Sequence, residues 1–299
     1  MKDPRPKRAL VVFNPAAGRR RRAALAEALD HFRRKGVFTT VRETEAPGDA
    51  ERIAAEATAG SCDVVVAAGG DGTFNEVLNG LGAEAPPLAV LPLGTANVLA
   101  VELGLPRRIE AVVEVIVEGR TRPFWPGIVN GRRFALMAGV GVDAMAVDAV
   151  GVRQKRLFGR YAYAGQALLA IARGGFSGYV LDVDGSRVEA GSAIVTLGSN
   201  YGGSYVLAPS ASLFQPELLV CILRGCRRRD HLRYAAALLR GRLAEQSDVR
   251  IVPARRIAIA GPAAAPVQCD GNIVCRLPAT FTLAARPVAL VVPAVLAEP

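Results

Sequence analysis

The feature that most constrains the fold is an alternation of short β-rich runs with helical segments from Ala9 to about Gly119. The runs typical of strands span residues 9–13, 37–43, 64–68 and 88–91. Apolar residues recur at helical spacing between and after them, over residues 23–35, 49–59, 74–81, 97–103 and 107–117. Strands that alternate with helices pair in parallel, so this part predicts an open α/β domain built from βαβ units.

The pattern changes after residue 119. The dipeptides Asn130-Gly131 and Asp184-Gly185 each lie between two strand-like runs, which is typical of β-hairpins and favours an antiparallel sheet. Helical spacing returns at residues 161–173 and 230–243. We therefore expect one domain over residues 1–121 and a β-rich domain over 122–285. The apolar tail, 286–299, is expected to pack back on the first domain.

Composition limits the function classes. The formal charge of +10 favours phosphate-bearing partners, but aromatic residues make up only 6% and do not interleave with basic stretches, which argues against nucleic acid. No apolar run reaches 18 residues, and the first one is too short for a signal peptide. Five cysteines without a CxxC pair, and only two histidines, argue against a disulfide framework or a zinc site. These features predict a cytoplasmic protein.

The stretch Gly69-Gly70-Asp71-Gly72-Thr73 joins the third predicted strand to a helix. Glycines at a helix start leave backbone N–H groups accessible, and these favour phosphate. The carboxyl edge of an open parallel sheet is also where ligands bind. We also expect a capping box from Thr73 to Glu76. A tight turn with this box as its only role is the alternative, and it would leave Asp71 unexplained. For this loop alone both interpretations stay open.

Two more strand-to-helix corners carry glycine with asparagine or threonine, at residues 14–18 and 92–97. All three corners would converge on one edge of the sheet. The sequence contains neither GxxxxGK[ST] nor GxGxxG after a strand, so a phosphate would be held by backbone and hydroxyl groups. The arginines at 19–22 either form a solvated face or contact a phosphate group of ATP or of an anionic membrane.

The segments NPAAG (14–18), GGDGTFNEV (69–77) and PLGTANVLA (92–100) resemble the diacylglycerol kinase catalytic-domain family, which includes bacterial lipid kinases and sphingosine kinases. Later segments, GVGVDA (139–144), SNYGGSYVLAPSASL (199–213) and CDG (269–271), are similar to its later motifs. GGDGT also occurs in NAD kinases and resembles the phosphofructokinase loop, whereas PLGTAN is more specific. The resemblance implies a Rossmann-like α/β nucleotide-binding domain and a C-terminal antiparallel β-sandwich-like domain, with ATP and the lipid headgroup in the cleft between them.

The resemblance also implies site residues. Asp71 would be catalytic and the best protein partner of the Mg²⁺ that arrives with ATP. Asp143 would touch the lipid headgroup or simply cap the helix after it, and for Thr44 a structural role before a helix stays open. The implied ATP site consists of Asn14, Thr44, Gly69, Gly70, Asp71, Gly72, Thr73, Asn75, Gly94, Thr95 and Asn97.

The sequence departs from the family pattern at two places. The family usually has Asp-Gly-Glu, with the Glu as proton acceptor, where this chain has Asp270-Gly271-Asn272. Asparagine takes no proton at neutral pH, so either Asp270 is the base or the protein is slow or inactive. At a second place Pro216 stands where the family often has a magnesium-binding acid. The carbonyls of Leu213 and Leu218 would remain, and they make a poor site for a hard cation.

The sequence thus predicts an ATP-dependent, Mg²⁺-dependent lipid kinase of phospholipid metabolism that contacts an anionic membrane peripherally. Its acceptor would be a hydroxyl of diacylglycerol, a related lipid or a long-chain base. The alternatives are a catalytically impaired relative that binds nucleotide or lipid, and a kinase for a soluble substrate such as NAD. We expect the apolar stripe at residues 157–169 to pack in the core rather than to cover an acyl chain. We expect arginines 227–229 to form a solvated face rather than a membrane contact. A homodimer is compatible with the sequence, which does not require one.

Overall fold

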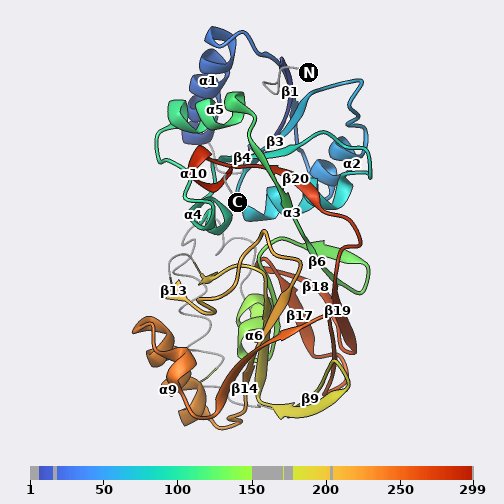
Figure 1. Ribbon diagram of the computed structural model, residues 1–299, viewed down its shortest axis with the longest axis vertical. Coiled ribbons are helices and arrows are strands. Elements are labelled where there is room, and N and C mark those ends of the chain that lie inside the picture. Colours follow the sequence, from blue (N-terminus) through green and yellow to red (C-terminus); the bar gives the residue numbers. More distant parts are fainter. Residues whose placement is uncertain (1–6, 16–18, 150–170, 172–177, 203–204, 298–299) are drawn as a thin grey trace. The chain divides into compact units, whose positions relative to one another are not determined.

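The computed structural model describes residues 7–15, 19–149, 171, 178–202 and 205–297 (Figure 1). The chain divides into two compact units, one formed by Met1–Phe124 with Arg286–Pro299 and the other by Trp125–Ala285. The stripe at 157–169 and most of the loop at 14–18 lie outside the described residues. Within the described ranges, no helix combines the length and the apolar character needed to cross a bilayer.

The first unit contains a mixed sheet in the order β2-β1-β3-β4-β20-β5. β1 to β4 and β20 pair in parallel, and only β5 runs antiparallel, beside β20. The predicted α/β fold is therefore confirmed, with one antiparallel edge strand that the sequence analysis did not anticipate. The strands are β1 (Arg8–Phe13), β2 (Phe38–Glu43), β3 (Val64–Gly69), β4 (Leu88–Pro92), β5 (Thr121–Phe124) and β20 (Val288–Val291).

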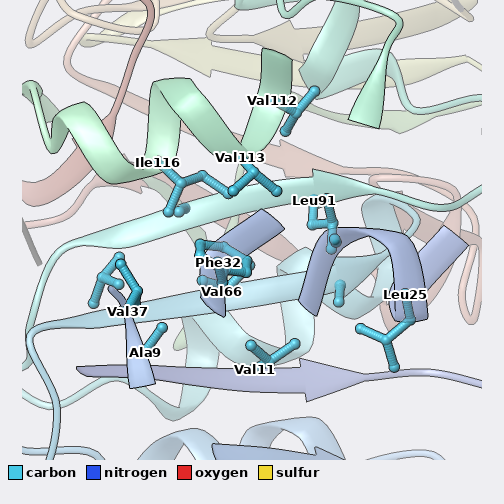
Figure 2. Packing of buried hydrophobic residues seen from close by; sticks show 14 of the residues in the cluster. Ala9, Val11, Leu25, Phe32, Val37, Val66, Leu91, Val112, Val113 and Ile116 are labelled. Carbon is cyan, nitrogen blue, oxygen red and sulfur yellow. The ribbon is translucent and has the colours of Figure 1, made fainter. Parts of the chain in front are cut away.

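The helices of this unit are α1 (Arg19–Arg34), α2 (Asp49–Ala55), α3 (Asp71–Gly80), α4 (Val98–Glu102), α5 (Ile109–Glu118) and α10 (Ala294–Ala297). Helices α1 and α5 bury Phe32, Val112 and Ile116 against alternate residues of the sheet such as Val11 and Val66 (Figure 2). This packing explains why β1 and β3 are almost continuously apolar, because parallel strands are buried by the helices that connect them.

The second unit contains two six-stranded antiparallel sheets, as expected, and they fit the predicted sandwich-like class. One has the order β10-β9-β16-β19-β6-β7, with β6 (Gly127–Val129), β7 (Arg132–Phe134), β9 (Tyr179–Val183), β10 (Ser186–Ala190), β16 (Arg256–Ala260) and β19 (Ala279–Leu283). The other has the order β15-β14-β11-β8-β17-β18, with β8 (Met137–Val140), β11 (Ser192–Thr196), β14 (Leu218–Leu223), β15 (Val249–Ala254), β17 (Pro266–Cys269) and β18 (Asn272–Arg276).

Both predicted hairpins are present in the first of these sheets. Asn130-Gly131 joins β6 to β7, Asp184-Gly185 joins β9 to β10, and all four residues have positive φ, as a type I′ turn requires. The remaining elements of the unit include α6 (Val142–Ala149), α9 (Arg228–Leu239) and a short hairpin of β12 (Asn200–Tyr201) with β13 (Tyr205–Val206).

Candidate functional site

The residues that follow β2, β1, β3 and β4 lie side by side at the carboxyl edge of the first sheet. The N–H of Thr44 donates to the last carbonyl of β1 (2.9 Å), and that of Asn14 donates to a carbonyl near the end of β3 (3.1 Å). The N–H of Leu93 donates to the carbonyl of Gly69 (2.9 Å). The three glycine-bearing corners therefore converge, and they do so at the edge where open α/β sheets bind ligands.

Asp71 connects the second corner to the third. It is the first residue of α3, and its two carboxylate oxygens accept the N–H groups of Val98 and Leu99 at the start of α4, both at 3.0 Å. These bonds satisfy two N–H groups that a helix cannot pair internally. Burial raises the pKa of Asp71, and the two backbone bonds oppose that rise. Asp71 thus has a structural role that the sequence analysis missed.

The predicted capping box from Thr73 to Glu76 is wrong. The N-cap of α3 is Gly70, which makes no side-chain cap bond, so Thr73 already lies inside the helix. Its Oγ1 instead accepts the side-chain amide of Asn14 (3.2 Å), which joins the first corner to the second. The carboxylate of Glu76 accepts the N–H of Gly48 at the start of α2 (3.1 Å). The helix begins earlier than the spacing rule assumed, because the glycine loop itself turns helical.

The glycines of the loops are required by close backbone contact. A Cβ on Gly94 would lie 2.5 Å from the Cα of Gly70 and 2.4 Å from Oδ1 of Asn97. A Cβ on Gly69 would lie 2.4 Å from Oγ1 of Thr73. Phe74 makes the first helical bond of α3, to Gly70, so the N–H groups of Gly72 and Thr73 precede the helical ladder. Backbone N–H groups at a helix start, in a loop whose glycines leave room beside them, are suited to bind a phosphate.

Asn97 supplies an acceptor at the same place. It has a left-handed backbone (φ +48°), and its side-chain N–H₂ donates to the carbonyl of Gly94 (2.9 Å). Its Oδ1 is buried and has no hydrogen-bond partner among the described residues. An unpaired buried acceptor is costly, so it favours a ligand with a hydroxyl or amino group. Loop donors together with this acceptor fit a nucleotide, which carries phosphates and also hydrogen-bond donors.

Two residues of the implied ATP site, Thr95 and Asn75, differ from each other in exposure to solvent. Thr95 is exposed in the loop between β4 and α4, next to Gly94. Asn75 is buried inside α3, where its Oδ1 accepts the side-chain amide of Asn79 (3.1 Å). Asn75 therefore stabilises its own helix, and its role at the loops remains only a prediction.

In the second unit, Asp270 is an anchor for the β17–β18 turn. Its carboxylate accepts the N–H groups of Ala135 (2.6 Å), Leu136 (2.9 Å) and Met137 (3.0 Å), and its φ is +47°. These donors occupy most of the lone pairs that a base would use. The geometry thus favours Asp270 as a positioning residue that holds the exposed Asn272, the next residue but one, in a fixed turn.

Asp143, at the start of α6, lies at the centre of a second polar network. Its carboxylate accepts the hydroxyl of Tyr201 and the side-chain amide of Gln268 (2.6 Å). Oε1 of Gln268 accepts the N–H of Gly271 (3.0 Å), so the network reaches the same β17–β18 turn. Burial raises the pKa of Asp143, against the effect of both hydrogen bonds. Burial and the adjacent Asp143 also raise the pKa of Tyr201. The sequence analysis missed Gln268, because a lone glutamine in a strand carries no signal.

The predicted metal position at Leu213 and Leu218 gains no support. The carbonyl of Leu213 accepts the N–H of Trp125 (3.4 Å), and Leu218 is a residue of β14. Over the parts of the chain that the structure describes, no group of three metal-ligating side chains lies there.

Comparisons with known proteins agree with this architecture. The family model of the diacylglycerol kinase catalytic domain matches residues 8–127, and that of the YegS C-terminal NAD kinase beta sandwich-like domain matches residues 137–295. The fold and these matches define a kinase with an α/β unit followed by an antiparallel β-rich unit.

Two curated relatives carry the same name. The diacylglycerol kinase of Bacillus subtilis strain 168 is 33% identical over 300 residues, which cover 98% of each chain. The diacylglycerol kinase of Staphylococcus aureus strain MRSA252 is 28% identical over 280 residues, which cover 92% of this chain and 89% of the relative. The chain belongs to the diacylglycerol kinase family, as the resemblance implied.

The fold is also that of a solved structure from this family. The crystal structure of a diacylglycerol kinase from Bacillus anthracis str. Sterne superimposes with a TM-score of 0.80 at 21% identity, over 97% of this chain and 98% of that one. At this identity the likeness shows the shared fold.

Asp143→Asn is expected to remove a pH dependence of stability. The raised folded-state pKa means that the stabilisation from this group is fully present below its unfolded pKa of about 3.9 and is lost as the pH rises through the folded value. The free energy of unfolding of the wild type minus that of the variant should therefore fall with rising pH. Urea unfolding over a pH series measures it.

Asp184→Asn is the matched control. Backbone N–H groups of Arg255 and Arg256 lower the pKa of the exposed Asp184, so its stabilisation is present above the unfolded pKa and is lost as the pH falls. The free energy of unfolding of the wild type minus that of Asp184→Asn should then rise with pH. Equal slopes for the two variants would contradict the buried network around Asp143.

Proposed function

We propose that this chain transfers the γ-phosphate of ATP to a hydroxyl of diacylglycerol, a related lipid or a long-chain base. The observation that carries the proposal is the junction of two glycine loops by Asp71, whose carboxylate accepts Val98 N–H and Leu99 N–H at 3.0 Å. The acceptor class rests on family membership, since the curated relatives are named diacylglycerol kinases.

The loops supply what phosphoryl transfer requires of a protein, which is positioning and compensation of charge rather than covalent chemistry. The N–H groups at the start of α3 would hold phosphate oxygens, and the hydroxyl of Thr95 would add a donor. Oδ1 of Asn97 would accept a hydroxyl or amino group of the nucleotide. The contact between Gly70 and Gly94 fixes the spacing of the two loops, so the donors are in place before the nucleotide binds.

Asp71 is the residue that would hold Mg²⁺. Its carboxylate accepts the N–H groups of Val98, Leu99 and its own backbone, which leaves a remaining lone pair for a cation. Bound Mg²⁺ would offset the charge of the transferring phosphoryl group. A cation would also relieve the cost of a buried carboxylate, which is the cause of the raised pKa of Asp71.

The residues at the expected position of the proton acceptor favour slow phosphoryl transfer. A positioned general base contributes about 10²- to 10⁴-fold, and this chain has Asn272 where the family usually has Glu, while Asp270 is held by three N–H groups. The same observation favours the second candidate function, a relative that binds nucleotide or lipid with impaired catalysis.

We also propose a cytoplasmic location with peripheral contact to an anionic membrane. The exposed face of α9 carries Leu232 (49% exposed) and Leu239 (62% exposed), which lie two helical turns apart. Arg228 and Arg229 are exposed at the start of the same helix. Basic residues near an anionic surface contribute about 1 kcal/mol each to binding.

Thr95→Ala is expected to raise the KM for ATP by about 2- to 10-fold with little change in kcat, because it removes one hydrogen bond worth about 0.5–1.5 kcal/mol. The side chain is exposed, so folding should be unaffected. The assay measures transfer of labelled γ-phosphate to diacylglycerol in anionic vesicles. Thr40→Ala is the matched control, since Thr40 is exposed on the edge strand β2.

Two outcomes of this assay contradict the proposal. If no lipid in a panel of diacylglycerols and long-chain bases incorporates phosphate above an Asp71→Ala background, the chain is not an active lipid kinase. If NAD is phosphorylated and no lipid is, the acceptor class is wrong.

Asn272→Glu is expected to raise kcat, by about tenfold or more, since it supplies the carboxylate that the family usually places there. The gain should grow as the pH rises above the usual pKa of a glutamate, about 4.3. Asn272→Gln has a similar size without a base and should show no gain. Equal rates for the two variants would show that the missing base does not limit turnover.

A further inference from the structure

Helices α1 and α5 pack against each other on one face of the first sheet. Their facing sides bury Leu25, Phe32, Val113 and Ile116 in one apolar cluster on the sheet (Figure 2). Three side chains outside this cluster converge across the pair. They are Glu27 and His31 on α1 and Glu110 on α5.

The three side chains lie near enough to one another to close on a single metal ion. Their ligand atoms all lie within 4.8 Å of one another. Glu27 and His31 are four residues apart and so share one face of α1. Nε2 of His31 lies 3.9 Å from Oε1 of Glu110, which is too long for a hydrogen bond. Two ligands on one tetrahedral Zn²⁺, each about 2.1 Å from the ion, lie roughly 3.4 Å apart, so a shift of about half an ångström would bring this pair onto one ion.

The charges around the cluster leave it available to a cation. The basic residues that follow His31 in α1 are paired elsewhere: Arg33 and Arg34 contact Asp30, and Lys35 contacts Glu114 at 2.9 Å. Arg108 donates a 3.5 Å hydrogen bond to Oε1 of Glu110, the atom that faces His31, so a metal ion would compete with it. The Arg108 side chain is 81% exposed, and its ion pair is screened by water.

We propose that Glu27, His31 and Glu110 bind a divalent transition-metal ion of the Zn²⁺ type that bridges α1 and α5. One imidazole and two carboxylates suit Zn²⁺, with water at the remaining position, whereas Mg²⁺ prefers oxygen ligands alone. This site is separate from the Mg²⁺ that ATP brings and is independent of the proposed lipid kinase activity. The three ligands come from two helices that are far apart in the sequence, so short sequence spacings do not reveal them.

Titration of metal-free, full-length protein with Zn²⁺ by isothermal calorimetry tests the proposal. All variants carry Cys226→Ser, because Cys226 is an exposed thiol that can bind zinc. One ion per chain should bind, and the melting temperature should rise with added Zn²⁺. His31→Gln and Glu110→Gln should each weaken binding by about tenfold or more. Glu118→Gln, which removes a carboxylate at the far end of α5 outside the cluster, should leave the affinity unchanged.

Three results would overturn the site. They are no Zn²⁺ binding by the protein with Cys226→Ser, equal affinities for His31→Gln and Glu118→Gln, or tighter binding of Mg²⁺ than of Zn²⁺. The readout is metal affinity, so failure here leaves the proposed phosphoryl transfer untouched. Failure of the lipid assay would likewise leave the metal site standing.

Discussion

The first unit depends on one buried carboxylate. Asp71 accepts two N–H groups from residues 27 and 28 positions later in the chain and thereby joins the starts of α3 and α4. Gly94 can lie against the backbone of Gly70 because it has no side chain, and the Asn14–Thr73 bond adds the first corner to the same assembly. The proposed nucleotide site is thus organised by backbone and side-chain groups that hold the three corners together. Burying the charged carboxylate of Asp71 costs free energy, and a bound cation would reduce that cost.

The second unit uses buried carboxylates in the same way. Asp270, in the β17–β18 turn, accepts N–H groups of the segment before β8. Asp143 binds Gln268, which in turn accepts the N–H of Gly271 in the same turn. Two separate sets of hydrogen bonds therefore hold the backbone around Asn272. These bonds hold the turn in which this chain has Asn272 at the position of the expected base. If the proposed role of that position is right, a single substitution at Asn272 is informative.

Local patterns predicted most of the fold. Strand-to-helix corners and turn dipeptides act over a few residues, so the βαβ order, both hairpins and the convergence of three loops could be predicted from the sequence. Contacts between distant residues could not, because spacing carries no information about them. Asp71 looked unexplained without Val98 and Leu99, Gln268 carried no signal, and Glu110 is separated from His31 by most of the first unit. The capping box from Thr73 failed for a related reason, since its spacing rule presupposes where the helix starts.

The central claim is that the carboxylate of Asp71 holds the two loops together. Amide hydrogen exchange of the wild type and of Asp71→Ala tests it directly, because exchange reports the opening of individual N–H groups. The account predicts that the amides of Val98 and Leu99 lose protection in the variant, while that of Val66, inside β3, keeps it. Unchanged protection at Val98 and Leu99 would show that the loops hold their arrangement without Asp71 and would contradict the account.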